Sequence, residues 1–445
     1  MNWYDLISDK RLGKEDDHKE TGEHRTQFQR DYDRLIFSSA FRRMQNKTQV
    51  FPLPGSVFVH NRLTHSLEVS SVGRSLGTDV ARVLATRHPE LAHSERLQSI
   101  GAIVSAACLA HDMGNPPFGH SGERAISTFF SEGKGAMLKD EVAPEVWTDL
   151  TRFDGNANAF RLLTHQFNGH RKGGFVMTYS TLAAIVKYPF PSALAPKGKN
   201  KFGFFVAEQP YYERIAGELG IPILRSEGGM VQRARHPLVY LVEAADDICY
   251  QIMDIEDAHK LRLLSDAETE QLLLAFLDEK TQAYVREAYP DVSDINDRIV
   301  YFRSIVINNL VQACVDCFCE NEDSILSGTF QGTLISNLPA PLLAAYKHCS
   351  EVAVKKVYRA KEVLDIDLAG YHIIYTLLDL MLEAVLAPEK AYSQLLLNQA
   401  SRQYELRADR LEDRLMAVLD YVSGMTDVFA LDLFRKISGQ SLPSV

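Results

Sequence analysis

Apolar residues recur along this chain at intervals of three and four positions, whereas the alternation of apolar and polar residues that marks strands is scarce. Gly, Pro and Asn stand at the breaks between the periodic segments. The spacing predicts helices over residues 25–45, from His65 to Val83, over residues 98–110 and over residues 237–260. We therefore expect an all-α protein built as a helical bundle.

Three segments break the helical pattern. Residues 1–24 are mostly polar, which predicts a mobile N-terminal arm. Residues 47–62 contain two prolines and a glycine, so they predict a loop or a short hairpin. Residues 188–204 (YPFPSALAPKGKNKFGF) predict a surface loop, whose lysines either border a ligand entrance or only keep the loop solvated. Beyond residue 260 the pattern is that of further amphipathic helices.

The composition is that of an ordinary globular protein. The chain has 445 residues, of which 46% are hydrophobic and 24% charged, enough for a large core. No run of 18 apolar residues occurs, and the charged N-terminus lacks the apolar core of a signal peptide. We therefore expect a cytoplasmic protein without a membrane segment. The net charge of −10 argues against a surface coated with nucleic acid but is compatible with a local basic patch.

The six cysteines are too few and too unevenly placed to form a disulfide framework, so we expect reduced thiols. Cys314, Cys317 and Cys319 are close in sequence, but they lie in a helical segment without a second Cys or His pair at the usual zinc spacing. A zinc knuckle is the less favoured interpretation of this cluster.

Polar side chains that bind metals interrupt the most apolar segments. His65 falls on the core side of its helix, four positions before the first apolar residue of the stripe. The helix over residues 98–110 is apolar nearly all round and ends by delivering His111 and Asp112. A charge at the end of a buried helix is costly unless it is paired or bound to a metal. These residues therefore need a partner from elsewhere.

The apolar segment over residues 237–260 offers that partner. Asp246, Tyr250 and Asp254 are spaced by four and share one face of the predicted helix, and Asp247 is adjacent. Two imidazoles and two carboxylates form a ligand set that suits divalent manganese, iron, cobalt, magnesium or zinc. From spacing alone, Asp246 and Asp247 both remain open as the distant ligand.

The stretch over residues 111–123 reads HDMGNPPFGHSGE, so a Gly-Asn-Pro-Pro-Phe-Gly turn separates the first His-Asp pair from His120 and Glu123. His120 and Glu123 are three residues apart in the first turn of a helix expected to begin near Ser121, so they can share a face. Glu123 could be a capping acid favoured by the helix dipole, with His120 a loop residue. The alternative is that the two form a catalytic pair.

Seven ordered segments together resemble one family. They are KTQVFP (47–52), RLTHS (62–66), HDMGNPPFGHSGE (111–123), FDGNAN (153–158), KYPFP (187–191), EAADDICY (243–250) and YVSGMTD (421–427). The set resembles the bacterial deoxyguanosine triphosphate triphosphohydrolase (dGTPase) family of HD-domain phosphohydrolases. The resemblance implies an HD-domain catalytic core over residues 25–265. Additional C-terminal helices over residues 266–445 would pack with that core and take part in oligomerisation.

In that family two histidines and two aspartates hold a divalent ion, at positions that match His65, His111, Asp112 and Asp246. Asp246 is preferred because Tyr250 and Asp254 then fall four and eight residues later, where the family places residues that contact the sugar. Asp247 projects about 100° further round the helix and remains the alternative. The resemblance leaves the ion open among manganese, magnesium, cobalt, iron, nickel and zinc.

The resemblance also implies roles around the substrate. His120 and Glu123 match the family's catalytic dyad, in which the imidazole acts close to the α-phosphorus and the carboxylate orients it. Arg62 and Lys187 would meet phosphate oxygens, and Tyr250 would stack under the deoxyribose. The positions that match substrate contacts are Gln49, Arg62, Asn156, Lys187, Tyr250 and Asp254.

The implied activity is hydrolysis of a dNTP to a deoxynucleoside and inorganic triphosphate. Two rivals stay open: another HD-domain phosphohydrolase, such as a deoxynucleotide phosphatase or a nucleotide phosphodiesterase, and a non-enzymatic nucleotide- or DNA-binding regulator. The resemblance further implies a homo-oligomer, in the family a hexamer. Basic clusters within residues 355–361 and 402–414 make single-stranded DNA a candidate partner, although such clusters are more often solvated helix faces.

Overall fold

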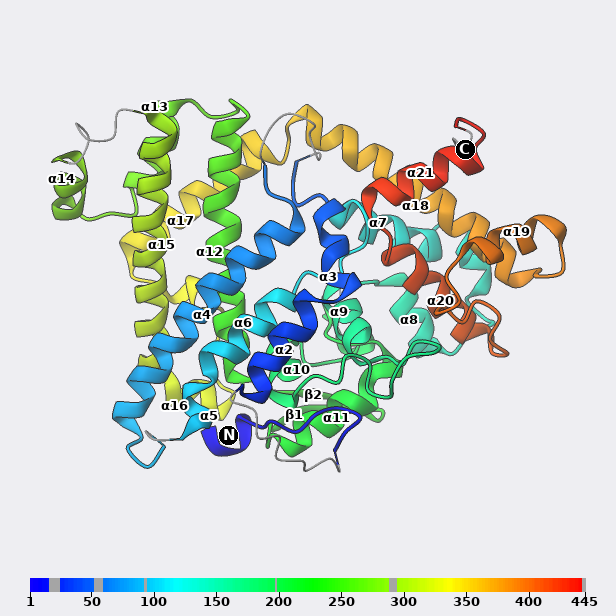
Figure 1. The fold of residues 1–445 in the computed structure, drawn as a ribbon, viewed down its shortest axis with the longest axis horizontal. Coiled ribbons are helices and arrows are strands. Elements are labelled where there is room, and N and C mark those ends of the chain that lie inside the picture. Colours follow the sequence, from blue (N-terminus) through cyan, green and yellow to red (C-terminus); the bar gives the residue numbers. More distant parts are fainter. Residues whose placement is uncertain (16–24, 52–58, 92–93, 197, 288–293, 442–445) are drawn as a thin grey trace.

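The computed structural model describes residues 1–445 apart from 16–24, 52–58, 92–93, 197, 288–293 and 442–445, and helices predominate in it (Figure 1). The prediction of an all-α fold is confirmed. The first helices are α1 (Trp3–Leu6), α2 (Gln27–Ile36), α3 (Ser39–Arg43), α4 (Arg62–Arg87), α5 (Glu95–Gln98), α6 (Ile100–Ala110), α7 (Gly119–Ser131), α8 (Pro144–Thr151), α9 (Gly155–Thr164), α10 (Tyr179–Ile185) and α11 (Gln209–Glu218). After a hairpin of β1 (Ile223–Glu227) and β2 (Met230–Arg233) come α12 (Pro237–Lys260), α13 (Asp266–Leu274), α14 (Glu279–Glu287), α15 (Ile295–Glu320), α16 (Glu322–Ser327), α17 (Ala340–Val352), α18 (Lys361–Leu386), α19 (Ala391–Gln399), α20 (Leu411–Ser423) and α21 (Asp427–Ile437).

The apolar periodicity located the central helices well. Helix α12 covers the predicted residues 237–260 from end to end, and α4 and α6 lie where the spacing placed them. The segment over residues 25–45 is not one helix, because it breaks between α2 and α3. Ser38 begins α3 as its N-cap, with its Oγ accepting a hydrogen bond of 3.1 Å from the backbone N–H of Phe41.

The hairpin of β1 and β2 was not predicted. Its strands pair antiparallel, with Glu227 opposite Met230, so the turn is Gly228-Gly229. Both glycines have positive φ, 58° and 81°, which a two-residue hairpin turn needs and which residues with a Cβ adopt rarely. All of β1 is exposed, so its side chains show no alternation between core and solvent. The glycine pair was the only local signal for these strands.

The N-terminal segment is not a free arm over residues 1–15. Trp3, Leu6 and Leu12 are buried, and the indole N–H of Trp3 donates a hydrogen bond of 2.8 Å to Glu322 Oε1. A few large apolar side chains thus anchor a segment whose average composition is polar. The expectation of a mobile arm was wrong for these residues, and its remaining part, 16–24, lies outside the described residues.

Helices α4, α6 and α12 pack together at the centre of the molecule, and glycines set how closely the first two approach. A Cβ on Gly77 would lie 2.9 Å from the Cα of Gly101, and a Cβ on Gly73 would lie 2.5 Å from Cys108 Sγ. Larger side chains at these positions would push α6 away from α4. This close packing matters because both helices carry predicted metal ligands.

The buried apolar side chains form two clusters. The larger is built around α4, α6, α12 and α15, and the second joins α7 and α8 to helices α18 to α21 (Figure 1). The C-terminal helices therefore pack directly on the segment that carries His120 and Glu123. The boundary expected near residue 265 stays a prediction.

Helix α18 is apolar enough over residues 363–386 to cross a membrane by length and composition alone. Half of that apolar window is buried inside the protein, where α18 packs against α7, α19, α20 and α21. We therefore interpret α18 as a core helix of the second cluster.

Candidate metal centre and adjoining pocket

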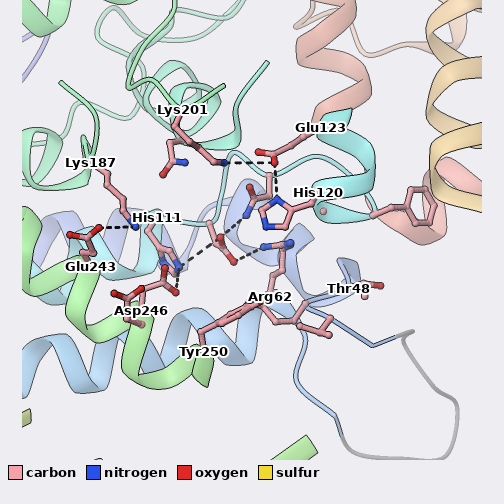
Figure 2. Close-up of a pocket in the computed structure, with 18 of the residues that line it drawn as sticks. Thr48, Arg62, His111, His120, Glu123, Lys187, Lys201, Glu243, Asp246 and Tyr250 are labelled. Carbon is pink, nitrogen blue, oxygen red and sulfur yellow. Dashed lines mark hydrogen bonds and ion pairs between the residues drawn. The ribbon is translucent and has the colours of Figure 1, made fainter. Parts of the chain in front are cut away.

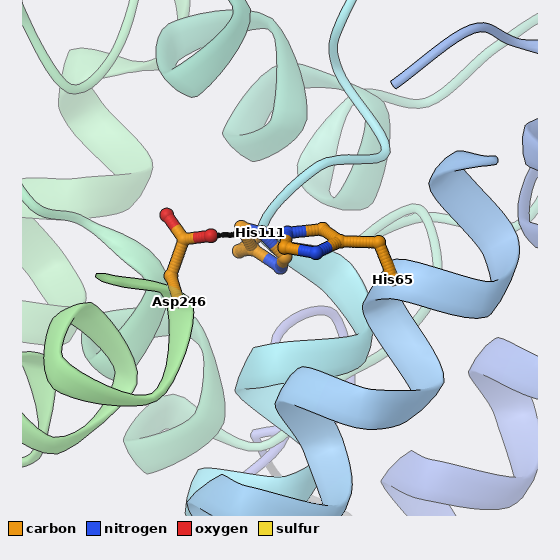
Figure 3. A group of neighbouring side chains, drawn as sticks. All are labelled: His65, His111 and Asp246. Carbon is orange, nitrogen blue, oxygen red and sulfur yellow. Dashed lines mark hydrogen bonds and ion pairs between the residues drawn. The ribbon is translucent and has the colours of Figure 1, made fainter. Parts of the chain in front are cut away.

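Three separate helices bring His65, His111 and Asp246 together (Figure 3). His65 lies in the first turn of α4, which begins with a capping box made by Asn61 and Thr64. His111 caps the C-terminus of α6, and Asp246 lies near the middle of α12. The close approach of α4 and α6 therefore decides that the two imidazoles meet.

One side-chain atom from each of these three residues lies within 4.8 Å of the other two. His65 Nε2 is 3.1 Å from Asp246 Oδ1, and His111 Nε2 is 3.4 Å from the same oxygen. Among the residues that the structure describes, this is the one group of His, Cys, Asp and Glu that could hold a metal ion. A zinc site at the three neighbouring cysteines of α15 finds no support there.

The surroundings of His111 prepare it to bind a cation. Its Nδ1 lies 2.6 Å from the carbonyl oxygen of Cys108, which can only accept, so Nδ1 carries the proton. In the neutral imidazole, which is the form that binds a metal, the lone pair is then on Nε2, a buried atom that has no hydrogen-bond partner. A divalent ion would satisfy this atom, and the donor set of two imidazoles and a carboxylate fits such an ion.

The two adjacent aspartates of α12 differ in what they face. Asp246 points to the imidazoles, whereas Asp247 lines the pocket next to Lys187. Burial raises the pKa of Asp247 to about 7, even though the charge of Lys187 opposes the rise. For Asp246, burial would also raise the pKa, but His111 and His65 outweigh it and lower the pKa well below the usual value.

Asp112, the other predicted ligand, lies beside this cluster and is tied to neighbours. Its Oδ1 is 3.7 Å from His111 Nε2, and its Oδ2 accepts a hydrogen bond of 2.6 Å from Arg62 Nη1. The ion pair that Arg62 makes is therefore with Asp112 rather than with the acids of its own helix. Asp112 is not among the three residues whose atoms lie within 4.8 Å of one another, so its role as a fourth ligand stays a prediction.

A pocket of about 580 Å³ opens next to the cluster (Figure 2). This volume lies in the range of sites that enclose a small organic ligand. Ten of the predicted residues line it: Gln49, Arg62, His111, Asp112, His120, Glu123, Asn156, Lys187, Asp246 and Tyr250. The sequence thus predicted most of the wall, from segments spread over two hundred residues.

His120 and Glu123 form a hydrogen-bonded pair at one side of the pocket. His120 Nδ1 lies 2.8 Å from Glu123 Oε2, and Glu123 Oε1 accepts a hydrogen bond of 2.7 Å from the backbone N–H of Gly155. The imidazole is 77% exposed, whereas the carboxylate is 11% exposed. A buried acid therefore holds an accessible imidazole, and α7 begins at Gly119, two residues before the predicted start.

Glu123 is kept ionised by its neighbours. Burial by itself would raise its pKa, but the hydrogen bond with His120 and the charge of Lys201 outweigh burial and lower the pKa. Gly155 allows the close contact, since a Cβ there would lie 2.9 Å from Glu123 Oε1. The FDGNAN segment thus holds Glu123 of the His120–Glu123 pair through the backbone N–H of Gly155.

Four cationic side chains line the pocket: Arg62, Arg124, Lys187 and Lys201. Lys187 Nζ pairs with Glu243 at 3.0 Å (Figure 2), and Lys201 Nζ pairs with Asp154 at 3.3 Å. Carboxylates line the same pocket, those of Asp112, Glu123, Glu243, Asp246, Asp247 and Asp367, so an anionic ligand would need a bound cation as well as the four cationic side chains.

Tyr250 and Tyr358 also line the pocket and stack with their ring centroids 6.1 Å apart, and the ring of Tyr250 lies 6.4 Å from that of His65. The hydroxyl of Tyr358 donates a hydrogen bond of 2.6 Å to Asp254 Oδ2. Asp254 is only 4% exposed and does not line the pocket, so Tyr358 stands between it and the cavity. Burial raises the pKa of Asp254 to about 7. The direct contact with substrate that we expected for Asp254 is not open in this arrangement.

Sequence reasoning missed Tyr358 and left open whether Lys201 borders the ligand entrance or only solvates its loop. Lys201 lies in the segment we expected to be a surface loop, but its neighbours Phe202 and Phe204 are fully buried and turn Lys201 toward Glu123. That apolar pair was a usable signal. Tyr358 follows a π-helical turn over Ala353–Val357, more than a hundred residues after Tyr250, and no spacing pointed to it.

Comparisons with known proteins identify two family domains in the chain. The HD domain matches residues 62–171 and the phosphohydrolase-associated domain matches residues 337–436. A deoxyguanosinetriphosphate triphosphohydrolase-like protein of Pseudomonas aeruginosa is 37% identical over 459 positions, covering all of both chains. One of Synechocystis sp. is 38% identical over 466 positions, covering 99% of this chain and 100% of that protein.

A deoxyguanosinetriphosphate triphosphohydrolase of Yersinia pseudotuberculosis is 31% identical over 492 positions, covering 92% of this chain and 93% of that protein. Identity at this level along nearly whole chains, with both domains present, establishes common descent. The chain belongs to the deoxyguanosinetriphosphate triphosphohydrolase-like family of HD-domain phosphohydrolases.

Proposed function

We propose that this protein is a metal-dependent dNTP triphosphohydrolase, which converts a dNTP and water into a deoxynucleoside and inorganic triphosphate. The observation that carries the proposal is that the His65, His111 and Asp246 cluster and the His120–Glu123 pair share one pocket with four cationic side chains. The names of the relatives support the same substrate class.

His65, His111 and Asp246 would hold the ion, with Asp112 as the fourth ligand. A divalent cation there supplies Lewis-acid polarisation of a phosphate and positive charge against the triphosphate. Arg62, which pairs with Asp112, would hold a phosphate oxygen next to the ion. Manganese, magnesium, cobalt, iron, nickel and zinc are all compatible with these donors.

The reaction joins a water oxygen to the α-phosphorus and breaks the bond between that phosphorus and the 5′-oxygen, which leaves with a proton. His120 would manage this proton transfer. Its Nδ1 is held by Glu123, so its Nε2 can exchange a proton while the ionised carboxylate balances the charge of the imidazolium. Lys187 and Lys201 would neutralise the triphosphate, and Asn156 and Gln49 would complete the wall of the pocket.

Tyr250 would pack against the deoxyribose and leave no room for a 2′-hydroxyl. Because Tyr358 already donates to Asp254, we propose that Asp254 acts on the sugar through Tyr358 rather than by direct contact. A ribonucleotide would then be excluded by the two stacked rings. This selectivity separates the proposed enzyme from a general nucleotidase.

Partners beyond the nucleotide remain proposals. A homo-oligomer, hexameric as in the family, and binding of single-stranded DNA both follow from the resemblance. In the basic clusters, Lys356 pairs with Glu268, Arg410 pairs with Glu412, and Arg414 donates to the carbonyl oxygen of Val385. These contacts occupy charges that DNA would need, so they favour the interpretation of solvated helix faces.

The deciding experiment incubates the full chain with Mn²⁺ and each of the four dNTPs, with the products resolved by anion-exchange chromatography. Inorganic triphosphate and deoxynucleoside should appear in equal amounts. Release of orthophosphate or pyrophosphate would contradict the cleavage position and favour another HD phosphohydrolase. Nucleotide binding without any product would favour a regulator. The matching rNTPs, which should not react, provide the control for sugar selectivity.

A further inference from the structure

The backbone of residues 113–118 joins the metal cluster to the catalytic pair, so its shape sets the distance between them. The turn ends in two successive residues with left-handed backbone, Phe118 with φ 61° and Gly119 with φ 55°. Phenylalanine adopts this conformation rarely, at a cost of about 1–2 kcal/mol. Something outside the turn must hold Phe118 there.

Asp427, at the start of α21, supplies that contact from far along the chain. Its Oδ1 accepts a hydrogen bond of 2.9 Å from the backbone N–H of Phe118, and its Oδ2 accepts one of 2.8 Å from the backbone N–H of Thr48. The carboxylate is 6% exposed. Thr48 and Phe118 both line the pocket. One buried side chain therefore ties together two walls of the site.

The turn between α20 and α21 holds the same segment at two further points. Lys47 Nζ donates to the carbonyl oxygens of Asn115 and Ser423, the latter at 3.0 Å. Asn158 Nδ2 donates to the carbonyl oxygen of Gly114 at 2.7 Å and to Ser423 Oγ at 3.1 Å. Residues 114, 115 and 118 are thus each fixed by a side chain that belongs to, or bonds with, residues 423–427.

Helix α18 packs against the side chain of Phe118 in the same turn. A Cβ added at Gly370 would lie 2.5 Å from both the Cβ and the Cγ of Phe118, so the missing side chain is what makes room for the ring. Ser121 Oγ also donates a hydrogen bond of 2.6 Å to the carbonyl oxygen of Asp367. Two C-terminal helices, α18 and α21, therefore both contact the start of α7.

We propose that the C-terminal region positions the His120–Glu123 pair relative to the metal cluster, with Asp427 as the positioning residue. Asp427 touches neither the imidazole nor the ligand cluster and acts through the backbone of Phe118. Backbone hydrogen bonds from Gly119 to Pro116 and from Ser121 to Phe118 close the turn locally, and the buried carboxylate of Asp427 adds the side-chain contact that holds the N–H of Phe118 from outside. This role gives the phosphohydrolase-associated domain a direct part in the chemistry. The kinetic part of the inference rests on the proposed function.

The test compares Asp427→Asn with Asp432→Asn in the full chain. Whichever way the new amide turns at position 427, one of the two backbone N–H groups faces an NH₂ that cannot accept. Asp432 lies on the same helix and makes an exposed ion pair with Lys436 at 2.6 Å, so it is the matched control. For Asp427→Asn we expect kcat to fall about 10- to 100-fold, with KM and metal content as in the wild type.

Hydrogen exchange provides a readout that does not depend on activity. Amides of residues 114–121 should exchange faster in Asp427→Asn than in the wild type or in Asp432→Asn, while those of α6 stay unchanged. Unchanged exchange in this segment, or an unchanged kcat, would overturn the proposal. If the wild type hydrolyses no dNTP, the proposed function fails, and exchange alone still decides whether Asp427 holds the turn.

Gly370→Ala is the second variant, because it leaves every polar contact in place. The new methyl group must displace either the Phe118 ring or α18, at a cost of about 1–3 kcal/mol that offsets the gain of about 1 kcal/mol in helix propensity. If the position of Phe118 governs the pair, kcat should fall although the helix propensity improves. Full activity in this variant would contradict the proposal.

Discussion

Replacing Arg161 by Met should destabilise the protein far more than the loss of any exposed ion pair. Arg161, on α9, donates from Nε and Nη2 to the two oxygens of Asp420 at 2.7 and 2.8 Å, and from Nη1 to Glu208 Oε1 at 2.6 Å. The exposed fractions of these side chains are 5% for Arg161, 6% for Asp420 and 1% for Glu208. Methionine fills similar space but leaves two buried carboxylates without a counter-ion.

Removing one partner of a buried ion pair costs about 3–5 kcal/mol. An unfolding entropy of about 2.1 cal/mol/K per residue gives about 0.9 kcal/mol/K for 445 residues, if the chain unfolds as one unit. The melting temperature should therefore fall by about 3–5 °C. Arg82→Met is the control, because Arg82 is 75% exposed and its pair with Asp79 should contribute about 0–1 kcal/mol.

The effect should also depend on pH. Burial raises the pKa of Glu208 to about 7, and Arg161 opposes the rise, so removing Arg161 should raise this pKa further. A folded-state pKa above the unfolded value means that stability is lost as pH rises through the folded pKa. The melting temperature of Arg161→Met should therefore be closest to that of the wild type near pH 5.5 and furthest below it near pH 8. Scanning fluorimetry at both values tests this. A shift no larger than that of Arg82→Met would refute the reasoning.

Three further predictions concern the site and its surroundings. Asp246→Asn should lose bound metal, measured by inductively coupled plasma mass spectrometry, whereas Asp247→Asn should keep it; the reverse result would exchange their roles. His120→Ala should retain metal and melting temperature, since the side chain is 77% exposed, but lose about 10²–10⁴-fold in kcat. Asp257 and Glu68 outweigh burial and raise the pKa of His60 to about 10. The protonated imidazole therefore stabilises the folded protein fully below pH 6.5, and this stabilisation is lost as pH rises through 10. His60→Gln should flatten the fall in melting temperature between pH 7 and 10, and an unchanged slope would contradict that role.

The sequence was informative about features that depend only on neighbouring residues, such as the position of a helix and of polar side chains within it. Apolar spacing located α4, α6 and α12 because a helix repeats every 3.6 residues, and a buried face must repeat with it. It also pointed to His65, to His111 and to the aspartates at 246 and 247, because such side chains are costly within apolar helices unless they bind something, and the family resemblance favoured Asp246. The structure brings both histidines together with one aspartate, and it puts Asp246 rather than its neighbour Asp247 beside the imidazoles.

Predictions from the average composition of a segment failed where a few buried side chains decided its position. The first 15 residues are polar overall, yet Trp3 and Leu6 anchor them in the core. The segment around Lys201 is rich in Pro, Lys and Gly, yet two buried phenylalanines turn that lysine toward Glu123. Composition averages over a segment, whereas burial is decided residue by residue.

The sequence by itself determined the helices, the chemical character of the site and the identity of most of its residues. Only the tertiary structure decided that Tyr358 stands in front of Asp254, and that Asp427 holds the turn before His120 from 309 positions away. The physical reason is that apolar periodicity shows which face of a segment is buried but not which other segments pack against that face. The contacts that fix a catalytic distance depend on which segments the core brings together.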